Sequence, residues 1–422
     1  MSLLSRLIFW WYLFLTVLAI TASISLSFFE FASGLCLAWI VWFVFFIGSY
    51  SPQCSYDKQL VVLKRQVIKL PLGLIAIGSL FASVYATKFY TGKNPLEVLS
   101  SFQLGDSLYY DYQEYFRENK LSIFSSLKII PIFSLFYLKL AELYGFISVI
   151  IITEKIKLKN FIFLIIITFS QMLFSLARGT SFEIFEFLLL VFFSISMRNR
   201  LLNQKSHINI SKICFGVLLF LASVLYSLNL TLRGHGAQEL ICATNELCLS
   251  TNTFLYKCSN ALALFSFQLS GYFLFGIYYT SKFIETFWLK NLSNMSVLFF
   301  PFQSLMHTEL TANFLCNVEL DCRACWVPDI IIDVLSLGFL LLFFVVYWLG
   351  VFAKFLIKRV LVSCRFLELG LLYYIFIVLI SLPFGNLLTT SSANILTCIF
   401  LIIWFLYKRV MLSFRRALWV DR

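Results

Sequence analysis

Residues 167–196 read ITFSQMLFSLARGTSFEIFEFLLLVFFSIS, which is two apolar runs joined by a short charged segment. With its flanking residues, each run approaches the roughly 20 residues that a helix needs to cross a bilayer. A charged side chain at membrane depth is costly, so Arg178, Glu183 and Glu186 need a structural or functional reason to be there. The stretch predicts a membrane-embedded helical hairpin whose turn carries charged groups.

The rest of the chain has the same character. Of its 422 residues, 60% are hydrophobic and only 13% are charged, against about 25% charged in a soluble globular protein. The first apolar run, 7–27, lacks a small-residue cleavage site after a short apolar core, so we expect a retained helix rather than a removed signal peptide. The composition predicts an all-α, polytopic membrane protein.

Lysine and arginine gather in alternate loops, as the positive-inside rule requires. This bias accounts for the net charge of +12 without a nucleic-acid partner, and it places both termini in the cytoplasm. The basic segments are 53–69, 155–159, 198–212, 354–365 and the tail that follows Lys408. The ten predicted spans are 7–27, 31–50, 67–90, 129–152, 160–177, 182–197, 213–231, 331–352, 366–383 and 393–407.

Two long segments fall on the opposite side of the membrane. Residues 1–231 are expected to form an N-terminal bundle of seven spans with an external loop at 91–128. Residues 232–330 form a large external loop with a re-entrant or interfacial helix near 261–280. Residues 331–422 add three spans and a basic tail.

Six of the eleven cysteines lie in the large external loop. An even cluster in an extracytoplasmic loop is typical of disulfides formed in an oxidising compartment, although the spacing of Cys322 and Cys325 also suits zinc. The charge-derived topology favours disulfides, and fifteen pairings are open. The candidates are Cys242, Cys248, Cys258, Cys316, Cys322 and Cys325.

The hairpin turn has two interpretations. Thr180 and Glu183 have the spacing of a capping box, and Arg178 could extend to lipid headgroups, so the charges could simply start a helix. Alternatively, Arg178 binds a phosphate or pyrophosphate, because a planar guanidinium holds such oxyanions in a bidentate way. Arg233, between the seventh predicted span and two nearby glycines, is the second candidate for the same ligand.

Other polar residues are expected at the same external face. His235 and His307 are external histidines whose ordinary pKa suits a general base, although a lone histidine is more often structural. Arg323 and Asp329 lie at the mouth of the eighth predicted span. No external Asp-x-Asp pair indicates a metal, so we expect a metal-independent site without a cofactor.

Taken together, these features resemble the Wzy-type O-antigen polymerases. The resemblance rests on ten or more spans, a cytoplasmic N-terminus, the hairpin ARGTSFEIFEFLLL (177–190), a large external loop in the second half and the segment WVPDIIIDVLSLGF (326–339). An arginine motif with a glycine eleven positions later, found in some members, is absent, because Leu189 and Thr244 occupy those places.

The resemblance implies a glycosyltransferase in the bacterial inner membrane with its active site facing the periplasm. Such an enzyme transfers a growing glycan from undecaprenyl pyrophosphate to a new lipid-linked repeat unit, and a chain-length regulator protein is an implied partner. In this chain Arg178 and Arg233, with Arg323 and Asp329, are expected to bind substrate. The expected base is His307, followed by Glu183 and His235.

Three rival functions stay open. An O-antigen ligase, with lipid A–core as acceptor, has similar architecture and the same donor chemistry. A repeat-unit flippase is expected to carry charges along a central path and internal repeats, neither of which the sequence shows. A non-catalytic scaffold is expected to tolerate Arg178→Lys, whereas a bidentate phosphate site is not.

Overall fold

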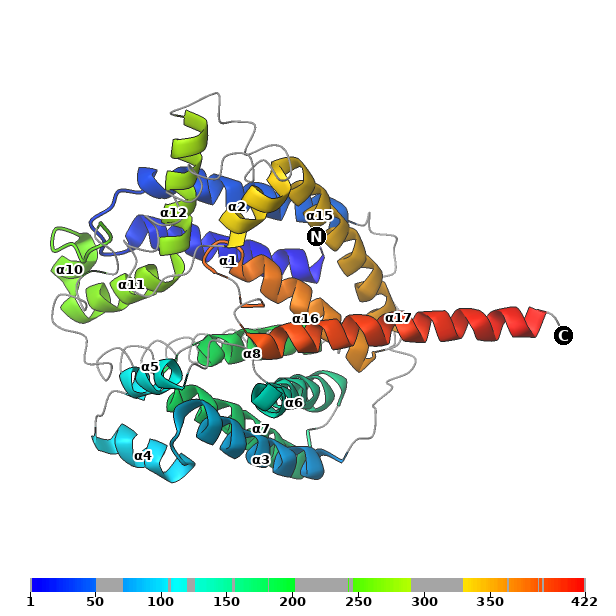
Figure 1. The fold of residues 1–422 in the computed structure, drawn as a ribbon. Helices are drawn as coiled ribbons and strands as arrows, with labels where there is room; N and C mark the ends of the chain where they lie inside the picture. The colour runs from blue at the N-terminus through cyan, green and yellow to red at the C-terminus, as the bar shows by residue number, and fades with distance from the viewer. Residues whose placement is uncertain are drawn as a thin grey trace. The chain divides into compact units, whose positions relative to one another are not determined.

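The computed structural model shows that the long apolar runs form helices (Figure 1). No strand occurs in the part of the chain that the structure describes, where the β structure is limited to isolated bridges. The predicted all-α character is confirmed for these residues. The structure describes residues 2–50, 71–104, 108–119, 126–153, 156–180, 182–201, 242, 246–289, 329–362, 364–385, 387–388 and 391–420.

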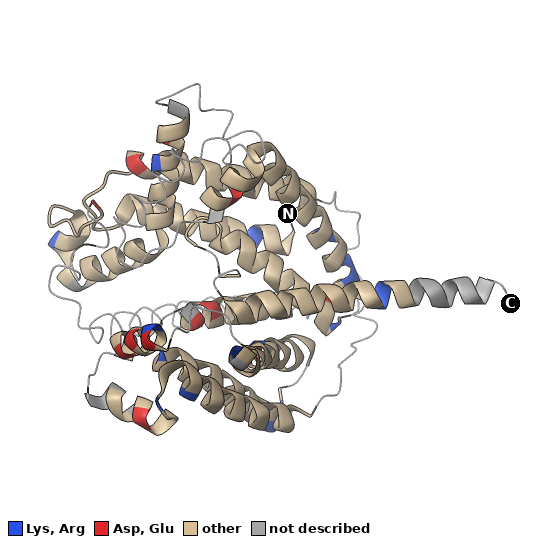
Figure 2. Cartoon of the chain, viewed as in Figure 1, with Lys and Arg blue, Asp and Glu red and all other residues tan. Residues whose placement is uncertain are grey.

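Seven of the described helices are long and apolar enough to cross a membrane. They also carry large apolar side chains that are exposed on the protein surface, as expected for helices in contact with lipid. Leu74 and Phe81, for example, are large apolar side chains of one such helix and are 67% and 73% exposed. Few charged residues lie along the long helices (Figure 2). The chain is therefore compatible with a multi-pass membrane protein. The seven helices are Leu3–Thr21, Phe29–Ser49, Leu72–Thr91, Ile129–Ile152, Leu158–Ala177, Ile330–Val362 and Ser392–Met411.

Two further predicted spans, 182–197 and 366–383, are also helical. They correspond to α8 (Phe182–Leu201) and the shorter α16 (Phe366–Ser381). The predicted span 213–231 lies outside the described residues, so the count of ten and the orientation in the membrane stay predictions.

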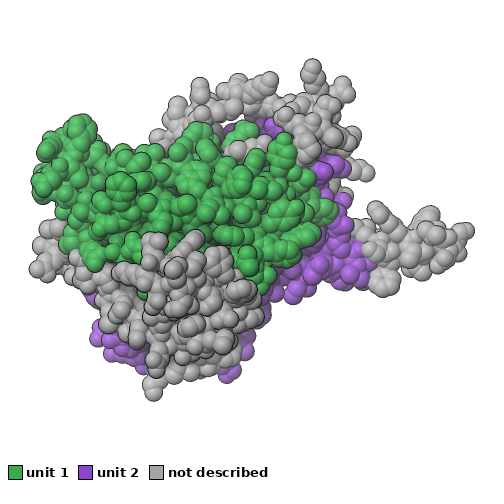
Figure 3. Space-filling model, turned by 90° about the horizontal axis from the view of Figure 1, so that it is seen from above, with its two compact units in different colours: residues 1–54, 235–355, 375–386 green, residues 55–234, 356–374, 387–422 purple. Residues whose placement is uncertain are grey.

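The described helices belong to two compact units (Figure 3). Each unit contains segments from both the N-terminal and the C-terminal half of the sequence. The predicted division of the chain into 1–231, 232–330 and 331–422 concerns its organisation in the membrane and stays a prediction. Unit 1 comprises Met1–Cys54, His235–Phe355 and Ile375–Asn386. Unit 2 comprises Ser55–Gly234, Leu356–Tyr374 and Leu387–Arg422.

Unit 1 is held together by close helix packing at small residues. Helix α2 (Phe29–Ser49) packs against α1 (Leu3–Thr21) and α12 (Phe275–Ile284). The amide of Gly34 donates a 2.8 Å hydrogen bond to Ser281 Oγ, and a side chain at position 34 would meet the backbone of Ile277. Small residues allow such close approach between membrane helices.

Helix α12 also forms one half of a bent pair. It follows α11 (Asn260–Phe273) with a bend of 51°, which is the geometry of a broken span or a re-entrant loop. The short α10 (Phe254–Cys258) precedes α11, and the π-helical segment η5 (Glu285–Leu289) follows α12. The predicted re-entrant or interfacial helix near 261–280 falls on this pair and stays a prediction.

Helix α15 (Asp329–Val362) contains a break. Gly338 has φ 70° and ψ 163°, which is outside the helical region and is readily adopted by glycine. The predicted span 331–352 therefore lies in a kinked helix.

Unit 2 contains a bundle built from α3 (Leu72–Thr91), α6 (Ile129–Gly145) and α7 (Leu158–Ala177), which pack against one another. The π-helical segment η3 (Phe146–Ile152) continues α6 and packs against α8. Helix α17 (Ser392–Val420) packs on α6. The shorter α4 (Pro95–Leu104), α5 (Leu108–Glu118) and η2 (Ser126–Lys128) lie between α3 and α6 in sequence.

The two ends of this bundle differ in charge. Lys157, Lys159 and Arg198 lie at the start of α7 and the end of α8, and Arg198 donates to the carbonyls of Ile150 and Thr153. The other end is mixed in charge: it carries Arg178, Lys88 and Lys128 together with Glu183 at the start of α8. This is the distribution that the sequence predicts if the basic end is cytoplasmic.

Candidate functional site

The turn between α7 and α8 has a backbone that depends on Gly179. Its φ of +61° lies in the left-handed region, where a side chain is disfavoured. A Cβ at this position would also come within 2.7 Å of the backbone nitrogen of Tyr109 on α5. Ser175 Oγ donates a 2.7 Å hydrogen bond to the Thr180 carbonyl and closes the turn. The turn thus has a defined shape that sets the position of Arg178.

Arg178 is held by an ion pair within the same hairpin. Its Nη2 group contacts Glu183 Oε1 and donates a 3.2 Å hydrogen bond to Thr180 Oγ1. Thr180 Oγ1 in turn donates to Glu183 Oε2 at 3.0 Å. Thr180 and Glu183 are therefore in contact, but through their side chains and not as the predicted capping box, because the Thr180 amide donates to the Ser175 carbonyl at 3.2 Å.

Aromatic side chains flank the guanidinium. Its central carbon lies 4.6 Å from the ring centre of Phe174 and 5.8 Å from that of Tyr112 on α5. Such cation–π contacts favour a cation beside the ring faces. Burial raises the pKa of the Tyr112 phenol, while the neighbouring Arg178 opposes this rise. Tyr112 is therefore a neutral hydroxyl at physiological pH.

Helix α5 is positioned by contacts with α4 and α7. Val98, Leu108 and Ala177 form an apolar cluster. Lys93 Nζ, just after α3, lies 2.5 Å from Asp111 Oδ2 on α5. These contacts hold the aromatic side of α5 against the turn that carries Arg178.

The guanidinium keeps hydrogen-bonding capacity for a ligand. The Arg178 side chain is 21% exposed, and its buried Nε has no hydrogen-bond partner among the described residues. A guanidinium has five N–H donors, and those contacts to Glu183 and Thr180 that the structure shows use the Nη2 end. The exposed part of the guanidinium can donate hydrogen bonds to an oxyanion, and the partly exposed ring of Tyr112 lies beside it.

A second charged cluster lies inside the bundle. Lys139 Nζ on α6 lies 2.8 Å from Glu142 Oε2 on the same helix and 2.9 Å from Glu186 Oε1 on α8. All three side chains are at most 2% exposed. We call Lys139, Glu142 and Glu186 the buried triad. The presence of Glu186 in an apolar helix is thus explained by its ion pair with Lys139 on a neighbouring helix. Glu186 does not take part in the cluster that Glu183 forms at the turn.

Two further helices contribute polar groups around the triad. The hydroxyl of Tyr373 on α16 donates to the Glu186 carbonyl at 3.4 Å. Asn394 on α17 interacts with the Glu186 carboxylate, accepts from the Tyr374 hydroxyl at 3.4 Å and donates to the Leu387 carbonyl at 2.7 Å. The triad is therefore enclosed by α6, α8, α16 and α17.

The predicted site residues are only partly described. The structure brings Arg178 and Glu183 together. Asp329 is the first residue of α15, and the structure describes its backbone but not its side chain. Four predicted residues lie outside the described residues, namely Arg233, His235, His307 and Arg323.

Sequence reasoning missed Lys139 and Glu142. Both lie in the apolar run 129–152, where a lysine and a glutamate three residues apart stand out. That spacing places them on one helix face and was the available signal for a pair. The contact with Glu186 had no local signal, because it joins residues 47 positions apart in separate helices.

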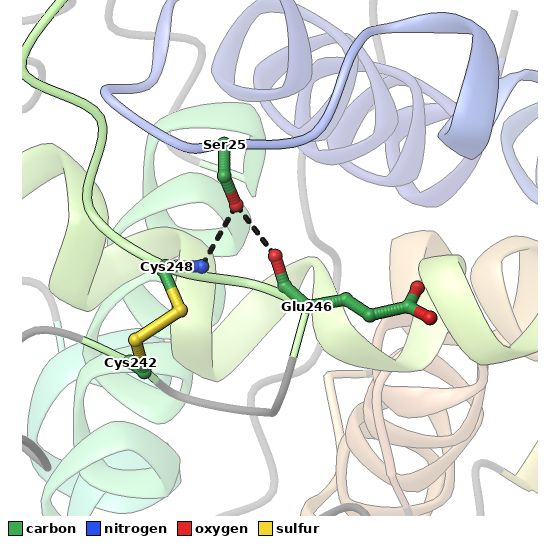
Figure 4. Close-up of a disulfide and its surroundings, with 4 residues drawn as sticks. All are labelled: Ser25, Cys242, Glu246 and Cys248. Atoms are coloured by element: carbon green, nitrogen blue, oxygen red, sulfur yellow. Dashed lines mark hydrogen bonds between the residues drawn. A yellow bond between two sulfur atoms is a disulfide. The ribbon is translucent and has the colours of Figure 1, made fainter.

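Two of the predicted disulfide candidates are bonded to each other. Cys242 is bonded to Cys248, and Ser25 accepts from the Cys248 amide at 3.0 Å while donating to the Glu246 carbonyl (Figure 4). Cys258 is exposed and carries a free thiol. Cys316, Cys322 and Cys325 lie outside the described residues, so the wider disulfide framework stays a prediction.

Within the described ranges, no group of three or more histidine, cysteine, aspartate or glutamate side chains is arranged to hold a metal ion. No family model, curated protein or solved structure matches this chain.

Proposed function

We propose that this chain is an integral membrane glycosyltransferase that polymerises lipid-linked oligosaccharide repeat units. Its donor and acceptor would be glycans on undecaprenyl pyrophosphate, and its site would face the periplasm of a bacterial inner membrane. The proposal is supported chiefly by one observation: Arg178 is fixed at the end of a membrane-type bundle by Glu183 and Thr180, and its side chain is still 21% exposed.

The chemistry of the proposed reaction suits a fixed arginine. When the acceptor hydroxyl attacks the anomeric carbon, the bond to pyrophosphate breaks and negative charge grows on the leaving group. A preorganised guanidinium stabilises that charge more than it stabilises the ground state. The partly exposed ring of Tyr112 can pack against the sugar or the isoprenoid chain near the diphosphate, whereas the ring of Phe174 is buried and holds the guanidinium in place.

Glu183 has a positioning role in this proposal. Its carboxylate contacts Arg178 and Thr180, so it orients the guanidinium and balances its charge before substrate binds. The acceptor hydroxyl needs a separate base to take its proton. Glu183 was also predicted as a base, but its contacts with Arg178 and Thr180 favour the positioning role. His307 and His235 stay the predicted bases, and Arg233, Arg323 and Asp329 stay predicted substrate-binding residues.

Glycan analysis of a deletion strain tests the proposal. Loss of a polymerase should leave single repeat units on the lipid core, and the wild-type gene should restore long chains. Arg178→Lys should fail to restore them, because a lysine cannot make a bidentate contact. Arg117→Lys is the matched control, since Arg117 is an exposed arginine on the neighbouring helix α5. A core without any repeat unit would indicate a ligase instead.

The buried triad favours a second candidate function, ion-coupled transport of the lipid-linked unit. Ionisable residues inside membrane bundles are costly and commonly mark ion pathways. A transporter deletion should leave repeat units on the cytoplasmic side of the membrane. A polymerase deletion should leave them on the outer side, so accessibility of the units to an added glycosidase separates the two functions.

A further inference from the structure

The buried triad has one more negative than positive group. Lys139 is the cation in ion-pair contact with both Glu142 and Glu186, so full ionisation of all three leaves a net charge of −1. Both carboxylate oxygens lie within 2.9 Å of the same nitrogen, and hence within about 6 Å of each other. Two carboxylates that share a dry site resist simultaneous ionisation.

The carboxylate of Glu142 also lacks a donor. Its Oε1 atom is buried and has no hydrogen-bond partner within the described chain, although Oε2 contacts Lys139. An unsatisfied buried carboxylate oxygen is costly, because it has lost its water without replacement. Glu186 Oε1 lies 2.9 Å from Lys139 Nζ but is likewise without a hydrogen bond in the described chain. The site therefore lacks one positive charge and at least one donor, and a single proton would supply the charge and one donor.

Within the described residues, the surrounding helices supply no further cation in ion-pair contact with the triad. The charged residues that α3 and α7 contribute, Lys88 and Lys159, lie in the terminal turns of these helices. On α8, Glu183 is paired with Arg178. On α16, Glu368 is paired with Arg359 at 3.3 Å.

The other groups around the triad are neutral. Tyr373 and Tyr374 on α16 present hydroxyl groups, and Asn394 and Thr397 on α17 present an amide and a hydroxyl. Cys398 follows on α17 as a partly buried free thiol. The charge excess is thus a property of Lys139, Glu142 and Glu186 together.

We propose that the buried triad is a proton-binding site, in which Glu142 and Glu186 share one exchangeable proton beside the ammonium group of Lys139. Uptake forms an O–H bond on one carboxylate and makes the cluster neutral. Release breaks that bond, returns the proton to water and leaves the excess negative charge inside the bundle. The site is independent of the proposed glycosyl transfer.

The pH dependence of stability follows from the proton count. Near neutral pH the folded triad holds a proton that the carboxyl groups of the unfolded chain have lost, so the folded state binds more protons. Stability must then fall as pH rises, until the triad has released its proton. Replacing either glutamate by glutamine leaves one ammonium and one carboxylate, which is already neutral and needs no proton.

Infrared spectroscopy of the full chain in lipid nanodiscs tests the proposal. We expect a protonated-carboxyl C=O band at neutral pH that shifts in D₂O and disappears in alkali. Both Glu142→Gln and Glu186→Gln should abolish it, because each removes the charge excess. Glu368→Gln is the matched control, since Glu368 is equally buried but has its own arginine, and this variant should keep the band.

Three results would overturn the proposal. The first is a wild-type spectrum without a protonated-carboxyl band at neutral pH, whether the buffer contains sodium or choline. The second is a band that persists in either glutamine variant, because the remaining carboxyl group would then hold a proton without a charge excess. The third is a band that vanishes in Glu368→Gln. The wild-type spectrum alone decides the first point, even if a variant does not fold.

Discussion

Replacing Lys139 by methionine should destabilise the protein strongly. The methionine preserves much of the side-chain length but removes the ammonium group that lies 2.8 Å from Glu142 and 2.9 Å from Glu186. Removing one partner of a buried ion pair commonly costs about 3–5 kcal/mol, because the other charge is left uncompensated. Proton uptake by the carboxylates relieves part of that cost, so we expect a loss of about 3 kcal/mol near neutral pH and a smaller loss in acid.

The measurement is the free energy of unfolding of the purified chain, obtained by denaturant titration. Lys157→Met is the control, because Lys157 is an exposed lysine in unit 2, and it should change the free energy by less than about 0.5 kcal/mol. Combining Lys139→Met with Glu142→Gln and Glu186→Gln should restore most of the loss, since no buried charge is left unpaired. A cost below about 1 kcal/mol for Lys139→Met, or no recovery in the triple variant, would refute this reasoning.

Three further predictions concern the turn and the disulfide. Arg178→Lys should reduce glycan polymerisation by about 10-fold to 100-fold, the equivalent of one charged hydrogen bond, while Arg117→Lys leaves it unchanged in the same assay. Gly179→Ala should lower the free energy of unfolding by at least about 1–2 kcal/mol, because the residue has a φ of +61°. Mass spectrometry of a non-reduced digest should find a peptide in which Cys242 is bonded to Cys248.

Each of these three predictions would be contradicted by a specific result. Full activity of Arg178→Lys would reduce Arg178 to a structural residue of the hairpin. Gly73→Ala, at a glycine in helix α3 without a positive φ, is the control for Gly179→Ala, and equal effects would remove the role of the left-handed conformation. Alkylation of Cys242 or Cys248 without reduction would contradict the disulfide, whereas Cys258 should react.

The sequence predicts the helices well because apolar run length is a local property. The predicted spans 160–177 and 182–197 correspond to α7 and α8, and the charged turn between them lies where the capping signal indicates. Boundaries differ by several residues where polar and charged residues extend a helix, as at the end of α8, which reaches Leu201. Helix ends depend on caps and packing that a run of apolar letters does not specify.

The site was less predictable because its key contacts are tertiary. Arg178, Thr180 and Glu183 are neighbours in sequence, so their association could be anticipated from the motif. Tyr112 reaches Arg178 from α5, and Glu186 reaches Lys139 from another helix, so neither contact has a local signature. Contacts between residues on different helices depend on how the helices pack. A single sequence indicates only which helix faces are suited to packing against another helix.

The most direct test of the proposed function is a polymerisation assay with the purified chain in proteoliposomes. The substrate is an undecaprenyl-pyrophosphate-linked repeat unit, and the products are separated by length. Wild type should yield a ladder of longer lipid-linked glycans with release of undecaprenyl pyrophosphate, and Arg178→Lys should yield little or none. A wild-type protein that leaves the repeat units unextended, or an Arg178→Lys variant that extends them at the wild-type rate, would contradict the account.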